Sequence, residues 1–328
     1  MFAAGEFAEL IASPWATDVL GTLHGRATVL VDTSDGGAVP PLGSLPIVVI
    51  ALSGAAQPFD DPAGAWADIT IAHDAAELDD LVARIEATPI ASTSMAVLLR
   101  GSGQMPPPEA LAAESAVYSA LQESPEFLAW RASRPRKEIE DVGTVVRVAQ
   151  DGADLHITLD RPDRRNAYDV HMRDQLIAAL QLADDSTKRI VLRGNGPAFC
   201  SGGDLDEFGT RPDPGTAHLV RLTRSAGRHV HRLRARIEVE LHGWCVGAGI
   251  ELPAFATTVR AAPDTKISLP ELQFGLVPGA GGTVSVPRRI GRQRTNWLAM
   301  SGMTLDAETA LEWGLVDEIS EITPSPLG

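Results

Sequence analysis

The chain has 328 residues, and its hydrophobic and charged fractions of 44% and 22% are those of an ordinary folded globular protein. Its formal charge of −15 argues against a nucleic-acid-binding surface, because phosphate repels an acidic protein. No apolar run reaches the roughly 20 residues that span a bilayer, and the first residues are acidic where a secretory signal needs basic ones. Two cysteines, Cys200 and Cys245, are too few for a disulfide framework. We therefore expect a cytoplasmic protein with neither nucleic-acid nor membrane partners.

The first third of the chain carries one strand pattern and two helix patterns. The apolar run 47–52 predicts a buried strand, and apolar residues at helical spacing predict helices over 75–87 and 108–122. The charged, proline-bearing stretch 131–140 then predicts a boundary. We therefore divide the chain into an N-terminal part, residues 1–137, and a core, residues 138–328.

The core reads as an alternation of strands and helices. A hairpin is predicted where the strand patterns 144–149 and 155–159 flank Asp151-Gly152. Further strands are predicted over 189–193, 238–241 and 266–269, and further helices over 168–183, 217–235 and 304–313. The helix over 217–235 is rich in arginine, which favours a solvated or subunit-facing surface. Such alternation predicts an α/β fold.

Two glycine-rich turns follow predicted strands, at 198–205 and 247–249. The first lacks the Lys-Ser/Thr ending of a phosphate-binding loop, and the second opens a predicted helix near Glu251. Backbone N–H groups in such turns have no partner within the helix. Two turns from different strands are therefore able to present two donors to one oxyanion, although a role in packing alone remains open for each.

Two glutamates, Glu251 and Glu271, lie in apolar stretches just after strand ends. A pair of carboxylates in one apolar cleft titrates as a unit with one raised pKa, which suits proton transfer near neutral pH. Capping of a helix or pairing with an arginine explains the same pattern, and spacing alone leaves both interpretations open. The sequence contains no spacing typical of metal ligands.

Five segments in order carry a family resemblance, namely 159–167, 198–205, 243–252, 270–282 and 310–317. Over residues of about 140–318 the chain resembles the enoyl-CoA hydratase/isomerase (crotonase) family. The resemblance implies a crotonase-like spiral of ββα units with additional helices and assembly as homotrimers or hexamers. It also implies an acyl-CoA thioester as substrate, with coenzyme A as part of that substrate and no further cofactor.

The same resemblance assigns roles to individual residues. The backbone N–H groups of Gly203 and Ala248 would hold the thioester oxygen, Glu251 would orient and deprotonate water, and Glu271 would exchange the proton at the α-carbon. Contacts with coenzyme A are expected from Arg164, Arg165, Ala167, Ser201, Gly202 and Asp204. The leading prediction is an enoyl-CoA hydratase. The alternatives are a double-bond isomerase, a thioester hydrolase, an oxygenase-like enzyme and a non-catalytic acyl-CoA-binding scaffold.

The resemblance fails at both ends of the matching region. The chain stops eleven residues after Asp317, where family members continue into further helices. The order of motifs in 66–137 is similar to those missing helices, so we expect this stretch to replace them, as in a circular permutation; an unrelated helical appendage is the alternative. Glu114 shares an apolar helix face with Leu111 and Tyr118, which predicts a buried salt bridge or, as the alternative, a contribution to the acyl pocket.

Overall fold

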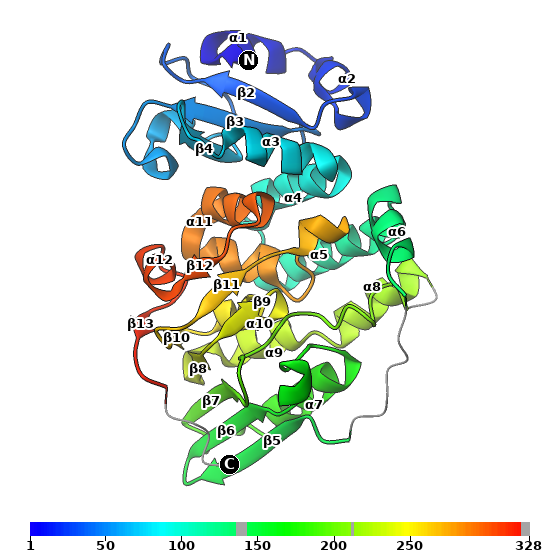
Figure 1. Ribbon diagram of the computed structural model, residues 1–328, viewed down its shortest axis with the longest axis vertical. Coiled ribbons are helices and arrows are strands. Elements are labelled where there is room, and N and C mark those ends of the chain that lie inside the picture. Colours follow the sequence, from blue (N-terminus) through cyan, green and yellow to red (C-terminus); the bar gives the residue numbers. More distant parts are fainter. Residues whose placement is uncertain (136–142, 211–212, 323–328) are drawn as a thin grey trace.

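The protein is described by a computed structural model that covers residues 1–135, 143–210 and 213–322. Its strands form three sheets, and the longest axis of the molecule runs from the N-terminal sheet at one end to the hairpin of β5 (Val146–Asp151) and β6 (Asp154–Leu159) at the other (Figure 1). The charged stretch 131–140, the predicted boundary, lies partly outside the described residues. No helix within the described ranges is long and apolar enough to cross a membrane.

The N-terminal sheet is entirely parallel, with the order β1 (Phe2–Ala3), β2 (Thr28–Asp32), β3 (Val48–Ser53) and β4 (Ile69–Ala72). The strand predicted at 47–52 is confirmed as β3. Its side chains alternate between two cores, because successive residues of a strand point to opposite faces. Val49 joins a small cluster with α1 (Ala4–Ile11) and α2 (Ala16–Leu20), whereas Ile50 and Leu52 face the main core.

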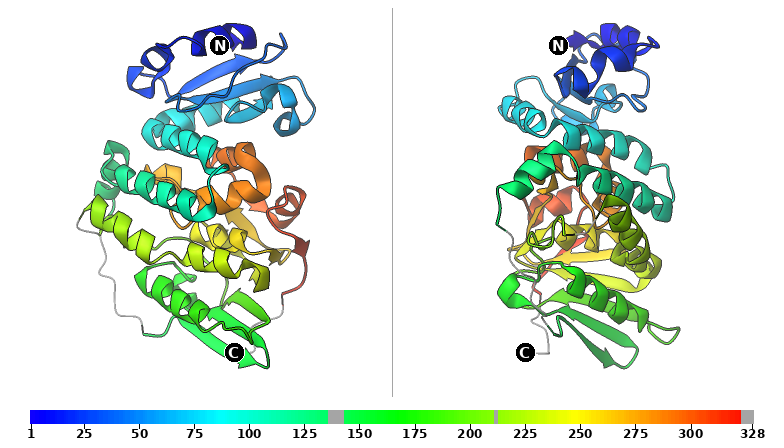
Figure 2. Two further views of the ribbon diagram at one scale, coloured as in Figure 1. Left: turned by 180° about the vertical axis from the view of Figure 1, so that it is seen from behind. Right: turned by 90° about the vertical axis from the view of Figure 1, so that its right-hand side faces the viewer.

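Four helices connect this sheet to the rest of the molecule: α3 (Leu78–Ala87), α4 (Pro89–Ser102), α5 (Pro107–Leu121) and α6 (Pro125–Ala132). The helices predicted over 75–87 and 108–122 are confirmed as α3 and α5. A proline occupies the first turn of α4, α5 and α6, where its missing N–H has no intrahelical partner to lose. Helices α4 and α5 lie between the N-terminal sheet and the core and pack against α11 (Gly282–Ser301) (Figure 2).

The core contains a six-stranded and a three-stranded sheet. The larger has the order β13 (Glu318–Ile319), β10 (Thr258–Ala261), β8 (Ile237–Leu241), β7 (Arg189–Gly194), β6 (Asp154–Leu159) and β5 (Val146–Asp151), and only β5 is antiparallel to its neighbour. The smaller has the order β12 (Leu305–Asp306), β11 (Lys266–Ser268) and β9 (Trp244–Val246). The predicted hairpin and the strands predicted at 189–193, 238–241 and 266–269 are confirmed.

The core helices are α7 (Val170–Gln181), α8 (Pro214–Thr223), α9 (Ala226–Leu233), α10 (Ala248–Glu251), α11 and α12 (Ala307–Glu312). The predicted helices 168–183 and 304–313 are confirmed as α7 and α12, with shorter bounds. The single helix predicted over 217–235 is wrong. The chain leaves helical geometry at Arg224 (φ −113°, ψ 55°), and the Ser225 hydroxyl accepts from the N–H of Arg228 to cap a new helix, α9.

Short 3₁₀ turns join these elements, at η1 (Thr22–His24), η2 (Pro58–Asp60), η3 (Pro62–Gly64), η4 (Pro162–Arg164), η5 (Arg234–Arg236), η6 (Pro253–Phe255) and η7 (Glu271–Phe274). Two of these turns lie next to the predicted catalytic glutamates. The single turn of α10 runs into η6, and η7 begins at Glu271, just after β11. Both predicted catalytic glutamates are therefore placed on short turns that begin where core strands end.

A buried charge network joins the N-terminal sheet to the core. The fully buried Asp68 carboxylate accepts from the Val49 N–H at 3.0 Å, from Arg100 Nε at 2.9 Å and from Arg292 Nη1 at 3.1 Å. Arg100 belongs to α4 and Arg292 to α11, so one carboxylate holds three elements. A buried pair of this kind is strongly destabilising when one partner is removed, because the remaining charge stays buried.

We expect Asp68→Ala to lower the free energy of unfolding by about 3–5 kcal/mol, because it leaves the Arg100 and Arg292 guanidinium groups without their carboxylate. Urea unfolding followed by fluorescence measures this change. The control is Asp60→Ala, since Asp60 pairs with Arg294 at 3.0 Å but its side chain is 51% exposed. Such a pair is worth about 1 kcal/mol or less. Equal losses from the two variants would contradict a stabilising role for the buried network.

Candidate active site

The two glycine-rich turns lie side by side, as the oxyanion hypothesis requires. Cys200 of the first turn forms a parallel bridge with Cys245 of β9, and a Cβ built at Gly249 would lie 2.4 Å from the Cys200 carbonyl oxygen. Only glycine permits that approach. Within the described residues, neither the Gly203 N–H nor the Ala248 N–H has a hydrogen-bond acceptor. Both residues line one pocket, which makes these N–H groups available to a ligand.

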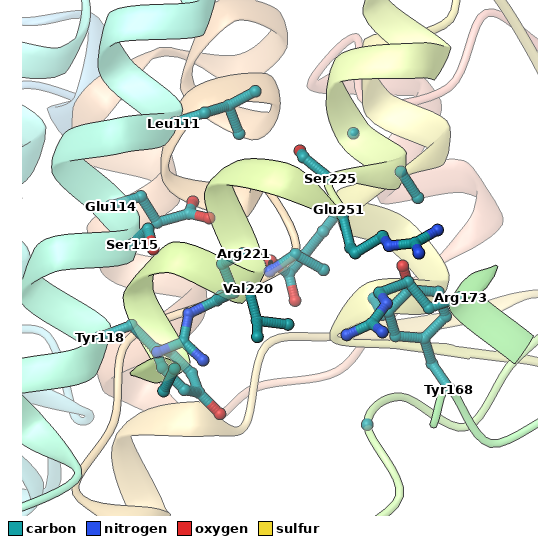
Figure 3. Close-up of a pocket in the computed structure, with 18 of the residues that line it drawn as sticks. Leu111, Glu114, Ser115, Tyr118, Tyr168, Arg173, Val220, Arg221, Ser225 and Glu251 are labelled. Carbon is teal, nitrogen blue, oxygen red and sulfur yellow. Dashed lines mark hydrogen bonds between the residues drawn. The ribbon is translucent and has the colours of Figure 1, made fainter. Parts of the chain in front are cut away.

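The same pocket contains three buried glutamates, from three separate elements. Glu114 comes from α5, Glu251 from α10 and Glu271 from η7, and their side chains are only a few per cent exposed. Figure 3 shows the Glu114 side chain extending from α5 toward the space that Glu251 occupies. Because α5 belongs to the N-terminal part, this part of the chain builds one wall of the candidate site.

Glu251 is held by the first turn of α11. Its Oε2 accepts from the N–H of Ala280 at 2.7 Å and from the N–H of Gly282 at 2.8 Å. Burial raises the pKa of Glu251 to about 7, although these two hydrogen bonds work in the opposite direction. The helix-capping interpretation is therefore correct for one oxygen. The other oxygen, Oε1, lies near Gly247 and belongs to the pocket.

The Glu271 carboxylate also approaches Gly247. A Cβ built at Gly247 would lie 2.3 Å from Glu271 Oε1 and 3.6 Å from Glu251 Oε1, so both carboxylates converge on this glycine. Among the described residues, Glu271 Oε2 is buried without a hydrogen-bond partner. Burial, and then the charge of Glu251, raises the pKa of Glu271 well above its usual range. The pair therefore combines a carboxyl group that ionises near neutral pH with one that holds its proton more tightly than a carboxyl group in water.

The salt bridge predicted for Glu114 is wrong. Its Oε2 accepts from the Thr283 N–H at 3.0 Å and from the Thr283 hydroxyl at 2.7 Å, and no cation pairs with it in the described part of the chain. Burial, with repulsion from Glu251, raises the pKa of Glu114 to about 8. The local pattern around Glu114 could not predict its hydrogen-bond partner, because Thr283 lies 169 residues further along the chain.

The raised pKa of Glu251 predicts how stability depends on pH. The folded state binds this proton more tightly than the unfolded chain, so the carboxyl contributes stability below its ordinary value of 4.5 and loses it as the pH rises through about 7. Relative to Glu251→Gln, the wild-type free energy of unfolding should fall by about 1.4 kcal/mol for each pH unit in this window. Urea unfolding at a series of pH values measures the difference. The exposed Glu123→Gln is the control, and an equal pH dependence in all three proteins would contradict the assignment.

The residues predicted to contact coenzyme A gather beside the oxyanion turn. Arg164, Arg165, Ala167, Ser201 and Asp204 line one surface depression together with Gly203, which also lines the carboxylate pocket, so the two hollows meet at this residue. Gly202, which precedes Gly203 in the chain, has a backbone conformation in the left-handed region, with φ +90°. Their contact with coenzyme A stays a prediction.

Some of the arginines beside this depression are already paired with carboxylates of the protein. Arg164 Nη2 lies 3.1 Å from carboxylate oxygens of both Asp204 and Asp206, and Asp204 also lies 3.4 Å from Arg161. Asp204 is therefore a structural anchor for the loop, whereas Arg165 has an exposed side chain and, among the described residues, no acidic partner. Arg165 is consequently the more available cation of the predicted pair.

Two residues that shape the site, Asn166 and Tyr118, were not among the predicted site residues. The buried Asn166 side chain donates to the carbonyl groups of Asn195, Ala198 and Phe199 and so fixes the first oxyanion turn to the loop before it. Its position inside the 159–167 motif was the signal. Tyr118, beneath the Arg221 guanidinium at 4.4 Å from the ring centre, was visible only as a residue on the same helix face as Glu114.

Comparison with known proteins identifies the family. A family model described as enoyl-CoA hydratase/isomerase matches residues 151–322, which is more than half of the chain. The chain belongs to this family. The enoyl-CoA hydratase structure from Thermoplasma volcanium is 32% identical and has a TM-score of 0.51, covering 54% of this chain and 72% of that one. The structure from Bacillus anthracis is 28% identical, with a TM-score of 0.50 and coverage of 54% and 70%. The predicted crotonase-like α/β fold is therefore confirmed for the core.

Curated relatives share the same region. An enoyl-CoA isomerase/hydratase of Mycosarcoma maydis is 34% identical over 177 residues, which are 50% of this chain and 64% of the relative. Two relatives from Escherichia coli are a 1,2-epoxyphenylacetyl-CoA isomerase, 34% identical over 50% of this chain and 65% of its own, and a 2,3-dehydroadipyl-CoA hydratase, 32% identical over 53% and 67%. The chain thus spans about two thirds of the length of these relatives. Their names cover both hydration and isomerisation of acyl-CoA thioesters.

Proposed function

We propose that this family member is an enoyl-CoA hydratase, which adds water to the 2,3-double bond of an acyl-CoA thioester. The observation that carries the proposal is the convergence of Glu251 and Glu271 on Gly247, beside two N–H groups without acceptors in the described residues. Coenzyme A would follow the depression that contains Arg165 and reach this point at Gly203.

The chemistry divides between the two glutamates according to their proton affinity. The Gly203 and Ala248 N–H groups would hold the thioester oxygen, where enolate charge develops, and one such donor is typically worth about 3–4 kcal/mol of the barrier. Ionised Glu251 would take a proton from water as its oxygen bonds to the β-carbon. Protonated Glu271 would give its proton to the α-carbon. The product gains one water, and proton exchange between the two carboxyl groups and solvent restores the starting state.

An absorbance assay tests the proposal. Crotonyl-CoA and longer 2-enoyl-CoA thioesters should lose their enoyl absorbance with wild type and keep it with the double variant Glu251→Gln/Glu271→Gln. Mass spectrometry should show a product heavier by one water. Formation of the conjugated enoyl chromophore from a 3-enoyl-CoA, without hydration, would instead favour a double-bond isomerase. Tight acyl-CoA binding without turnover would favour a scaffold.

The surroundings of the reaction follow from the same proposal. We propose a homotrimer or a hexamer, which light scattering after size exclusion measures directly, and a reaction that uses no cofactor beyond the coenzyme A of the substrate. The cytoplasm is the proposed location. Both cysteines are free and buried, which agrees with a reducing compartment.

We further propose that residues 66–137 take the place of the helices that follow the core in other family members. Helix α4 packs on α11, and α5 packs on both α8 and α11. The α5 residues Leu111, Glu114, Ser115 and Tyr118 line the carboxylate pocket. An appendage unrelated to the site would have no reason to form its wall.

A further inference from the structure

Glu114 is a buried carboxyl for which the proposed hydration has no role. Its side chain is 2% exposed and lines the same pocket as Glu251 and Glu271. Its hydrogen-bond donors are the N–H and hydroxyl of Thr283, at 3.0 and 2.7 Å. Burying an ionised carboxylate without a cation is costly, so its retention beside two other carboxyl groups calls for a physical reason.

The first turn of α11 connects the carboxyl groups. The Gly282 N–H donates to Glu251 at 2.8 Å, and the next N–H along the chain, that of Thr283, donates to Glu114. Both therefore use the positive end of one helix, whose unpaired N–H groups favour negative charge. Glu271 has no such donor for its buried Oε2 among the described residues. Of the three, Glu271 is the group whose ionisation the site supports least.

We propose that Glu114 is a positioning residue for the reaction: once it ionises on the alkaline side of neutrality, its charge in the shared pocket keeps Glu271 in its acid form. This inference rests on the proposed function, because it assumes that Glu271 delivers a proton. It also gives the N-terminal part a role in proton transfer beyond closing the pocket.

The order of ionisation supports this role. The pKa is about 7 for Glu251 and about 8 for Glu114. Burial, and then the charges of the other two glutamates, raise the pKa of Glu271 well above its usual range, and its buried Oε2 has no donor among the described residues to favour ionisation. At neutral pH Glu251 therefore carries more negative charge than Glu114. As the pH rises, Glu114 ionises next, and its negative charge opposes loss of the proton from Glu271.

Other charged or titratable groups belong to the same pocket or to elements packed against α5. Tyr118 lies one turn along α5, and its burial raises the pKa of the phenol. His218 forms a hydrogen bond with Ser115 of α5. The other charged residues that line the pocket are Arg173, Glu207, Arg221, Arg224 and Arg228. On α11, Arg288 donates to the carbonyl groups of Ser102 and Met105, at the end of α4. Direct donors to Glu114 come from Thr283, whereas Glu251 is the group whose charge raises its pKa.

Two substitutions separate an electrostatic from a structural role. Glu114→Gln keeps the shape and an oxygen that accepts from Thr283, but it cannot ionise. Glu114→Asp keeps the charge on a shorter side chain. If Glu114 acts by its charge, Glu114→Gln moves the alkaline limb of the kcat/KM profile to lower pH by at least about half a unit, and Glu114→Asp leaves that limb near its wild-type position. A purely structural role predicts the reverse, with an unchanged profile for Glu114→Gln and a loss at every pH for Glu114→Asp.

A measurement without turnover keeps this inference distinct from the proposed function. Difference infrared spectra of the protein record the carbonyl band of protonated carboxyl groups as the pH rises, and Glu271→Gln identifies the contribution of Glu271. In Glu114→Gln this band should disappear at lower pH than in wild type. If wild type hydrates no enoyl-CoA but the band behaves in this way, the proposed function is wrong, whereas the effect of Glu114 on the protonation of Glu271 is supported. An unchanged band position in Glu114→Gln overturns the inference, whatever the activity.

Discussion

Replacing Glu251 with glutamine is expected to lower kcat for enoyl-CoA hydration about 10²- to 10⁴-fold, the usual contribution of a positioned general base. The glutamine oxygen still accepts the N–H groups of Ala280 and Gly282, so the turn that holds the side chain is preserved. The amide cannot take a proton from water. The loss should therefore fall on kcat, with acyl-CoA affinity changed little.

Glu271→Gln is expected to lower kcat by a similar factor for a different reason. It removes the proton donor, so exchange of the α-proton with deuterated solvent should be lost as well. Stopped-flow absorbance gives the rates, and calorimetry with a non-reactive acyl-CoA gives the affinity. Glu123→Gln, which changes an exposed residue two positions after the end of α5, is the matched control. Retention of more than about a tenth of wild-type kcat by both variants would contradict the assignment of the pair.

Removing residues 1–137 is expected to abolish both folding and activity of the core. The deletion removes α4 and α5, which cover α11, and exposes apolar side chains of α11 such as Val284, Val286 and Leu298 that are fully buried in the intact chain. It also removes one wall of the pocket. The truncated chain should appear in the insoluble fraction, whereas the full chain remains in solution.

A rearranged chain supplies the control for this deletion. Placing residues 66–137 after residue 322 through a flexible linker returns α4 and α5 to the molecule from the other end of the sequence. If these helices replace those that usually follow the core, the rearranged chain should be soluble and should hydrate enoyl-CoA. A soluble, active trimer formed by residues 138–328 alone would contradict the replacement. If the rearranged chain is insoluble while the full chain is soluble, the N-terminal sheet is needed for folding as well.

Local patterns predicted the elements that depend on local chemistry. The buried run that became β3, the Asp-Gly turn between β5 and β6, and the amphipathic spacing of α3 and α5 each follow from a few neighbouring residues. The exception is the arginine-rich stretch 217–235. Its periodicity favoured one helix, but the Ser225 hydroxyl competes for the backbone and starts a second.

The sequence by itself determined the family and singled out Glu251 and Glu271 as candidates, because the order of motifs and the residue types can be read without knowing any contact. Only the tertiary structure decided that Glu114 joins that pair. Its environment depends on Thr283, 169 residues away, and on the packing of α5 against α11. The pKa of a buried carboxyl is set by burial, donors and nearby charges. All three arise from residues that are distant in the chain, which is why the sequence placed Glu114 on an apolar face but could not state its role.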